Sequence, residues 1–286
     1  MRPLYWSIRR ELWENRSIVM APLIVAAVVL FASLINITVR LPQKMRGLSA
    51  LDPAKQRAAV VTPYSMAASA IMLTGFVVGV FYCLDALNSE RRDRSILFWK
   101  SLPVSDRTTV LAKAGIPLVV QPLLTLAVAF ATQWAVLMMS SVVLAGHGLS
   151  PAALWTRLPL FQMPVVMVYG LAAHVLWFAP IYCWLLLVSA WARRAAILWA
   201  ALPFFTVLAI ERMAFGTSYF ASMLKYRLRG AMVEAFTVDP GKTAITRLAE
   251  LSPSRFLLSP GLWVGLLFAA ACLAAAVRLR RNRGPI

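Results

Sequence analysis

The feature that most constrains this chain is a series of six long apolar runs separated by charged segments. An α-helix needs about 20 apolar residues to cross the hydrocarbon core of a bilayer. Every backbone polar group must be paired there, and unbroken rather than alternating apolar runs favour helices over a barrel. We therefore expect an all-α, polytopic membrane protein that forms one transmembrane domain over residues 1–286. The six predicted spans are 18–39, 64–87, 110–144, 158–191, 195–210 and 262–277.

Composition and charge agree with lipid as the main solvent. The chain is 60% hydrophobic and 14% charged, whereas a soluble domain is about half apolar and a quarter charged. Its net charge of +18 would suggest nucleic acid in a soluble protein. Here the Lys and Arg residues lie between and beside the apolar runs, where they set orientation and contact anionic lipid head groups. We therefore expect membrane lipid and no nucleic acid as a partner.

The distribution of basic residues predicts the orientation of the spans. Cytoplasmic loops of membrane proteins carry an excess of Lys and Arg near the ends of the helices. Of the 29 Lys and Arg residues, 16 fall on the side of the two termini, and the other 13 are spread over longer loops. Both termini are therefore expected in the cytoplasm.

Two segments outside the runs are expected at the membrane interface. Residues 1–17 interleave Tyr5, Trp6 and Trp13 with charged residues, and aromatic rings favour the head-group level. The long segment 211–260 also mixes aromatic and basic residues and is external in this topology. Such a segment either caps a substrate path or seals the helix bundle, and the sequence is consistent with both.

The most informative stretch follows the second run, at residues 84–106. Its charged part is followed by an apolar patch at 96–99 and by Pro103, which stops a helix. This short element neither crosses the membrane nor has a core of its own, so its apolar surface needs a partner or the membrane interface. The candidate interface residues are Glu90, Arg91, Arg92, Asp93, Arg94, Phe98, Trp99, Lys100, Ser101 and Pro103.

This stretch resembles the cytoplasmic loop after the second span of ABC-2 type transporter permeases, in which Glu-Arg, a hydrophobic run and Ser-Leu-Pro-Val-Ser recur. The resemblance implies the ABC-2 permease fold and the membrane-spanning subunit of an ATP-driven exporter in a bacterial inner membrane. It also implies a second permease copy as a homodimer and two ABC ATP-binding subunits. Residues 88–107 would then be the coupling loop, with Phe98 and Trp99 as apolar anchors and 90–94 as the charged transmission segment. The residues alone are equally consistent with a basic juxtamembrane helix.

ATP hydrolysis is not expected on this chain. A phosphate-binding loop needs Gly, four residues and Gly-Lys-Ser/Thr. In front of Gly241-Lys242-Thr243 the first glycine position holds Phe236, and Pro240 removes a backbone donor. We therefore expect no cofactor on this chain and place ATP and magnesium on the partner ATPase.

Other catalytic chemistry also lacks residues. His147 and His174 are the only histidines, no His-Glu-x-x-His motif is present, and nothing in the spacing singles out Ser140 or Ser141 as a nucleophile beside His174. No catalytic or metal-binding residue is predicted. A self-contained intramembrane enzyme acting on lipid, and an assembly or sensor protein without transport, remain as alternative functions.

Four polar residues lie at membrane depth, namely Gln121, Gln133, Gln162 and His174. They are candidates for lining a translocation path, and hydrogen bonding between helices is the structural alternative. Few ionisable residues occur in the middle of the runs, which argues against a carrier driven by protons or ions. An external source of energy is consistent with that composition.

Overall fold

The computed structural model describes residues 3–47, 52–95, 98, 104–237 and 248–282. Within these residues the regular elements are helices, and an isolated β-bridge joins Phe236 to Leu251. The predicted all-α class is therefore confirmed. Six helices are long and apolar enough to cross a membrane, over Ser17–Val39, Ala59–Arg92, Asp106–Gly146, Gln162–Trp191, Ala196–Phe215 and Pro260–Asn282.

The elements follow one another as α1 (Pro3–Glu14), α2 (Ser17–Val39), α3 (Leu41–Gly47), α4 (Pro53–Asp85), α5 (Asn88–Arg92), α7 (Asp106–Gly115), η2 (Ile116–Val120), α8 (Gln121–Gly146), α9 (Ala152–Arg157), α10 (Gln162–Trp191), α11 (Ala196–Ile210), η3 (Glu211–Phe215), α12 (Tyr219–Ala235), η4 (Leu248–Glu250), α13 (Pro253–Leu258) and α14 (Pro260–Asn282). Each predicted run falls largely within one of the long helices. Most of these helices extend a few residues past the run, because polar end residues continue a helix without adding to an apolar pattern.

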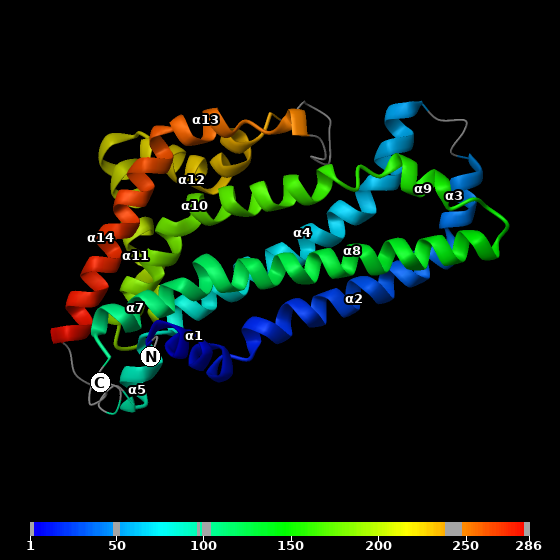
Figure 1. The fold of residues 1–286 in the computed structure, drawn as a ribbon. Coiled ribbons are helices and arrows are strands. Elements are labelled where there is room, and N and C mark those ends of the chain that lie inside the picture. The colour runs from blue at the N-terminus through cyan, green and yellow to red at the C-terminus, as the bar shows by residue number, and fades with distance from the viewer. Residues whose placement is uncertain (1–2, 48–51, 96–97, 99–103, 238–247, 283–286) are drawn as a thin grey trace.

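The long helices form a bundle in which α2, α4 and α8 lie side by side and α10 packs against α4 and α14 (Figure 1). The start of α1, the element α5, the start of α7 and the last turns of α14 lie together at one end, called the α5 end below. The short helices α3 and α9 lie at the opposite end of α2, α4 and α8. The segments before the first span and after the second therefore share one end with the last turns of α14, as the alternation of spans predicts.

Helix α10 forms the centre of the bundle. It is the most buried of the six spans, whereas α11 and α2 are the least buried. Trp177, Tyr182 and Leu186 of α10 belong to the largest hydrophobic cluster. A helix that is apolar on all sides belongs in a core or in lipid. The high burial of α10 is that of a core helix, and the low burial of α2 and α11 is that of helices that face lipid.

The third span contains an irregular turn where two prolines fall close together. Pro117 lies in the π-helical turn η2, and Pro122 lies in the first turn of α8. Proline cannot donate the helical hydrogen bond, and single π turns accommodate such interruptions. Pro180, in contrast, lies inside the continuous helix α10. The backbone adjustment expected from proline is therefore seen at the start of the third span.

Helix α12 is attached to α10 and α14 through one arginine. The indole N–H of Trp177 donates to the backbone oxygen of Arg227 at 2.7 Å, and Arg227 donates from Nη1 to the backbone oxygen of Gly261 at 3.0 Å. The Arg227 guanidinium also lies 4.8 Å from the Trp177 ring centroid, in cation–π distance. These contacts fix α12 across the two spans.

The fold predicts that adding a side chain destabilises the protein at Gly79 but not at Gly146. A Cβ on Gly79 of α4 would lie 3.1 Å from the Tyr182 ring and 3.2 Å from the Gln121 side-chain oxygen, whereas a Cβ on Gly146 of α8 would have no atom within 4 Å. We expect Gly79→Val to lower the free energy of unfolding by about 1–3 kcal/mol through overpacking. Gly146→Val should change it by less than about 0.5 kcal/mol. Thermal unfolding in detergent measures both, and equal Tm values would contradict the close α4–α10 approach.

Candidate functional site

The segment predicted to contact a partner begins at a turn that α10 holds in place. After α4 ends, the backbone N–H groups of Leu87 and Asn88 both donate to the hydroxyl oxygen of Ser189, each at 2.9 Å. Ser189 is fully buried in the last turns of α10. One hydroxyl thereby satisfies two backbone donors that the break in the helix leaves without helical partners.

Arg91, a predicted member of the charged transmission segment, is buried rather than exposed. Its Nη1 donates to the backbone oxygen of Ala190 at 2.8 Å. That oxygen lies in the last turn of α10, where helical carbonyls lack partners and favour a positive charge. Arg91 therefore fastens α5 to the end of α10.

Glu90 lies at the centre of a buried group of charges. Only 6% of its side chain is exposed. One carboxylate oxygen lies 3.1 Å from Nη2 of Arg10 and 3.2 Å from Nζ of Lys113, and the other accepts from Nη1 of Arg280. These three cations belong to α1, α7 and α14. One carboxylate of α5 therefore connects four helices at the α5 end.

Glu11 is the second buried carboxylate of this group. It accepts from Lys113, Arg10 and the Tyr82 hydroxyl, each at 2.8 Å. Arg280 also donates from Nε to Asp106 at 3.1 Å. The charge cluster, as it is called below, comprises Arg10, Glu11, Tyr82, Glu90, Asp106, Lys113 and Arg280.

Mutual pairing explains why these charges can be buried together. Removing an ion from water costs several kcal/mol, and the cost is offset only by close partners and hydrogen bonds. The pKa of Arg10 illustrates the balance, because burial alone would lower it while Glu11, Glu14 and Glu90 raise it above its ordinary value. Sequence reasoning assigned Lys113 and Arg280 to topology and missed them as partners of Glu90, since nothing local relates residues so far apart.

Farther along the predicted segment, the described residues Arg92, Asp93, Arg94 and Phe98 are exposed. Arg92 and Asp93 lie at the surface and pair with each other at 3.3 Å, and Arg94 has a left-handed backbone with φ 56°. Phe98 is 60% exposed. Trp99, Lys100, Ser101 and Pro103 lie outside the described residues. α7 then begins at Ser105, whose side chain accepts from the Thr108 N–H at 3.1 Å.

A cavity of about 870 Å³ lies between α4, α8, α10 and α12. Gln121, Gln133 and His174 all line it, so three of the four predicted path residues face one space. Gln162, the first residue of α10, is exposed and does not line this cavity. The structure therefore brings together residues from the third and fourth spans and leaves out the one at a helix end.

The polar residues of the cavity also hold the helices together. Gln121 donates from Nε2 to the backbone oxygen of Gly75 at 2.6 Å, and Thr125 donates to the backbone oxygen of Gln121. His174 packs against two rings, with its centroid 4.6 Å from that of Phe178 and 5.6 Å from that of Phe76. Gln121 therefore lines the cavity and also joins two helices by a hydrogen bond.

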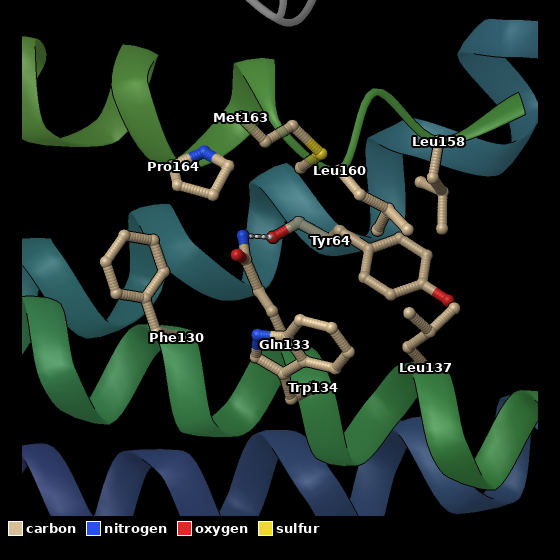
Figure 2. A pocket seen from close by; sticks show the side chains of 9 residues that line it. All are labelled: Tyr64, Phe130, Gln133, Trp134, Leu137, Leu158, Leu160, Met163 and Pro164. Carbon is tan, nitrogen blue, oxygen red and sulfur yellow. Dashed lines mark hydrogen bonds between the residues drawn. The ribbon is translucent and has the colours of Figure 1, made fainter. Parts of the chain in front are cut away.

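A smaller hollow of about 40 Å³ adjoins the cavity, and the two share Gln133 and Met163. Figure 2 shows the Gln133 amide in the middle of this hollow, with its nitrogen directed at the backbone oxygen of Tyr64 across a distance of 3.3 Å. Trp134 and Phe130 lie beside it on α8. Gln133 thus lies where a large and a small space meet.

The serines considered for catalysis are occupied by helix hydrogen bonds. Ser140 donates to the backbone oxygen of Val136 at 2.7 Å, and Ser141 donates to that of Leu137 at 2.9 Å. His174 lies instead against Phe76 and Phe178. Among the residues that the structure describes, no three His, Cys, Asp or Glu side chains gather as metal ligands.

The charge cluster predicts that neutralising the Glu90 carboxylate lowers the free energy of unfolding by a large amount. Glu90→Gln leaves Lys113 and Arg280 buried with less negative charge, and breaking a buried pair costs about 3–5 kcal/mol. Glu14→Gln is the matched control, because Glu14 is half exposed and pairs with Arg10 at 3.4 Å. Such a pair contributes less than about 1 kcal/mol. Urea unfolding in detergent measures both losses, and equal losses would contradict the central role of Glu90.

Comparison with known proteins does not assign this chain to a family. No family model, no curated protein and no solved structure matches it. The resemblance of residues 84–106 to ABC-2 type permeases therefore stays a prediction from the sequence. What the structure itself establishes is a helical chain with six helices able to cross a membrane, a buried charge cluster at one end and a cavity between its spans.

Proposed function

We propose that this chain is the membrane-spanning subunit of an ATP-driven ABC-2 type exporter in a bacterial inner membrane, with both termini in the cytoplasm. The observation that carries the proposal is the construction of the segment after the second span. Its first part is tied by Glu90 and Arg91 to α1, α7, α10 and α14. Its second part presents the exposed ring of Phe98. This combination suits an element that receives force from a partner and passes it to several helices.

The proposed motion follows from these contacts. Two ATP-binding subunits, which would hold ATP and magnesium, close on each other and push the 88–107 segment of each permease copy. Because Glu90 is paired with Lys113 and Arg280, and Arg91 with the end of α10, a displacement of α5 displaces α7, α10 and α14 together. Rigid-body rocking of packed helices is a known route to alternating access.

The cavity supplies the proposed translocation path. It is walled by α4, α8, α10 and α12, and α10 is also the helix that Arg91 and Ser189 attach to α5. Moving α10 relative to α4 and α8 would change the shape of this space. The mainly apolar lining favours a hydrophobic or amphipathic cargo. A second copy of the chain would complete the transporter as a homodimer.

The first test is purification of the tagged protein from its native membrane in mild detergent, with mass spectrometry of the eluate and an ATPase assay. We expect a soluble subunit with a phosphate-binding loop in stoichiometric amount, and ATPase activity that depends on this chain. A chain that purifies alone and without ATPase activity would overturn the proposal.

The second test replaces the apolar anchors of the coupling loop. Large apolar side chains dominate many interfaces, and loss of such an anchor commonly costs 2 kcal/mol or more. We expect Phe98→Ala with Trp99→Ala to reduce capture of the ATPase subunit by about tenfold or more while membrane insertion stays normal. Phe161→Ala is the control, because Phe161 is 92% exposed before α10 at the opposite end of that helix. Wild-type capture by the double variant would contradict the coupling role.

A further inference from the structure

The lining of the large cavity is uncharged and deformable. Among the described residues that line it, none is Asp, Glu, Lys or Arg. Methionine side chains adapt to irregular apolar shapes, and here they come from α4, α10 and α12. They are Met66, Met72, Met163, Met167 and Met232. A charged ligand would lack an ionic partner in this space, and burying an unpaired charge is costly.

Several polar side chains of the cavity donate their hydrogen bonds to backbone oxygens of the protein. Gln121 and Gln133 each donate an amide N–H to a backbone oxygen of α4, and the Ser65 hydroxyl donates to the backbone oxygen of Thr62 at 2.9 Å. The Gln133 side-chain oxygen has no hydrogen-bond partner among the described residues. An amide oxygen can accept two hydrogen bonds. The boundary between the large and the small hollow therefore offers an acceptor to a ligand.

We propose that this cavity binds an elongated, uncharged molecule that is apolar over most of its length and carries a hydroxyl or N–H group donating to Gln133. The apolar body lies among the methionines and the rings of Phe76, Phe178 and Phe236, and a small group enters the hollow beside Trp134. The inference rests on the proposed function, in that such molecules are the cargo class of the exporter. It concerns binding by this chain alone, so it can be tested without an ATPase.

The test uses three benzophenone photoprobes that differ at one position, which carries a hydroxymethyl, a methoxymethyl or a carboxylate group. Benzophenone inserts on illumination into nearby C–H bonds, including those of methionine. The purified chain in lipid nanodiscs is labelled, and mass spectrometry quantifies adducts at Met72, Met163 and Met167. Labelling at Met20, an exposed residue of the apolar span α2, corrects for partition of each probe into the membrane.

We expect the alcohol to label the cavity methionines about fivefold more than the ether, as one net hydrogen bond predicts. The carboxylate should label them at least about tenfold less than the alcohol. Gln133→Met should reduce labelling by the alcohol to the level of the ether. Gln162→Met, the same exchange at an exposed residue outside the cavity, should leave the preference unchanged.

The comparison of alcohol with ether in the wild-type chain needs no variant, so a poorly folded Gln133→Met protein would not remove the test. Equal labelling by all three probes after correction, or adducts confined to lipid-facing residues, would overturn the inference. Selective labelling of a chain that captures no ATPase would retain this binding site and reject the exporter. Capture of an ATPase without selective labelling would retain the exporter and reject this binding site.

Discussion

The pairing of the buried Glu90 carboxylate with three cations is the interaction on which the α5 end depends. Arg10, Lys113 and Arg280 come from three helices that are far apart in sequence, and each contacts this one group. A buried ion pair adds little net stability compared with apolar packing, but it penalises every arrangement that separates the charges. The cluster therefore specifies how α1, α5, α7 and α14 meet more than it stabilises the fold. Arg91 and Ser189 extend the same assembly to α10.

The spans combine tight packing with an internal space, and the same residues contribute to both. Gln121 and Gln133 of α8 join that helix to α4, while they also face the cavity. Hydrogen bonds between helices contribute modestly in membranes, about 0.6 kcal/mol on average. Side chains held in this way can release their backbone partners at little cost. A wall built from such bonds is stable enough to define a space and weak enough to rearrange around a ligand.

The sequence predicts the membrane spans of this chain better than it predicts the contacts of the segments between them. Apolar runs of about 20 residues specify helices directly, and the predicted span 18–39 differs from Ser17–Val39 by one residue. The composition of 84–106 predicts a segment that contacts a partner, but it does not predict the burial of Glu90 and Arg91. That burial depends on Lys113 and Arg280, which look like ordinary topological charges in a linear reading. Gln162 is predicted to line the path together with Gln121 and Gln133, because an apolar run does not specify the residue at which its helix begins. In the structure Gln162 is the first residue of α10 and lies outside the cavity.

The separation of Glu90 from Arg280 has a consequence for how the molecule matures. The two residues are 190 positions apart, and Arg280 lies near the end of the last span. During synthesis the earlier spans enter the membrane while Glu90 can already meet Arg10 and Lys113, but its third partner is not yet made. Chains emerge from the ribosome at about 5–20 residues per second, so an unfinished α5 end persists for roughly ten seconds or longer. Until the last helix is made, Glu90 is paired only with Arg10 and Lys113, and α5 lacks its ionic connection to α14.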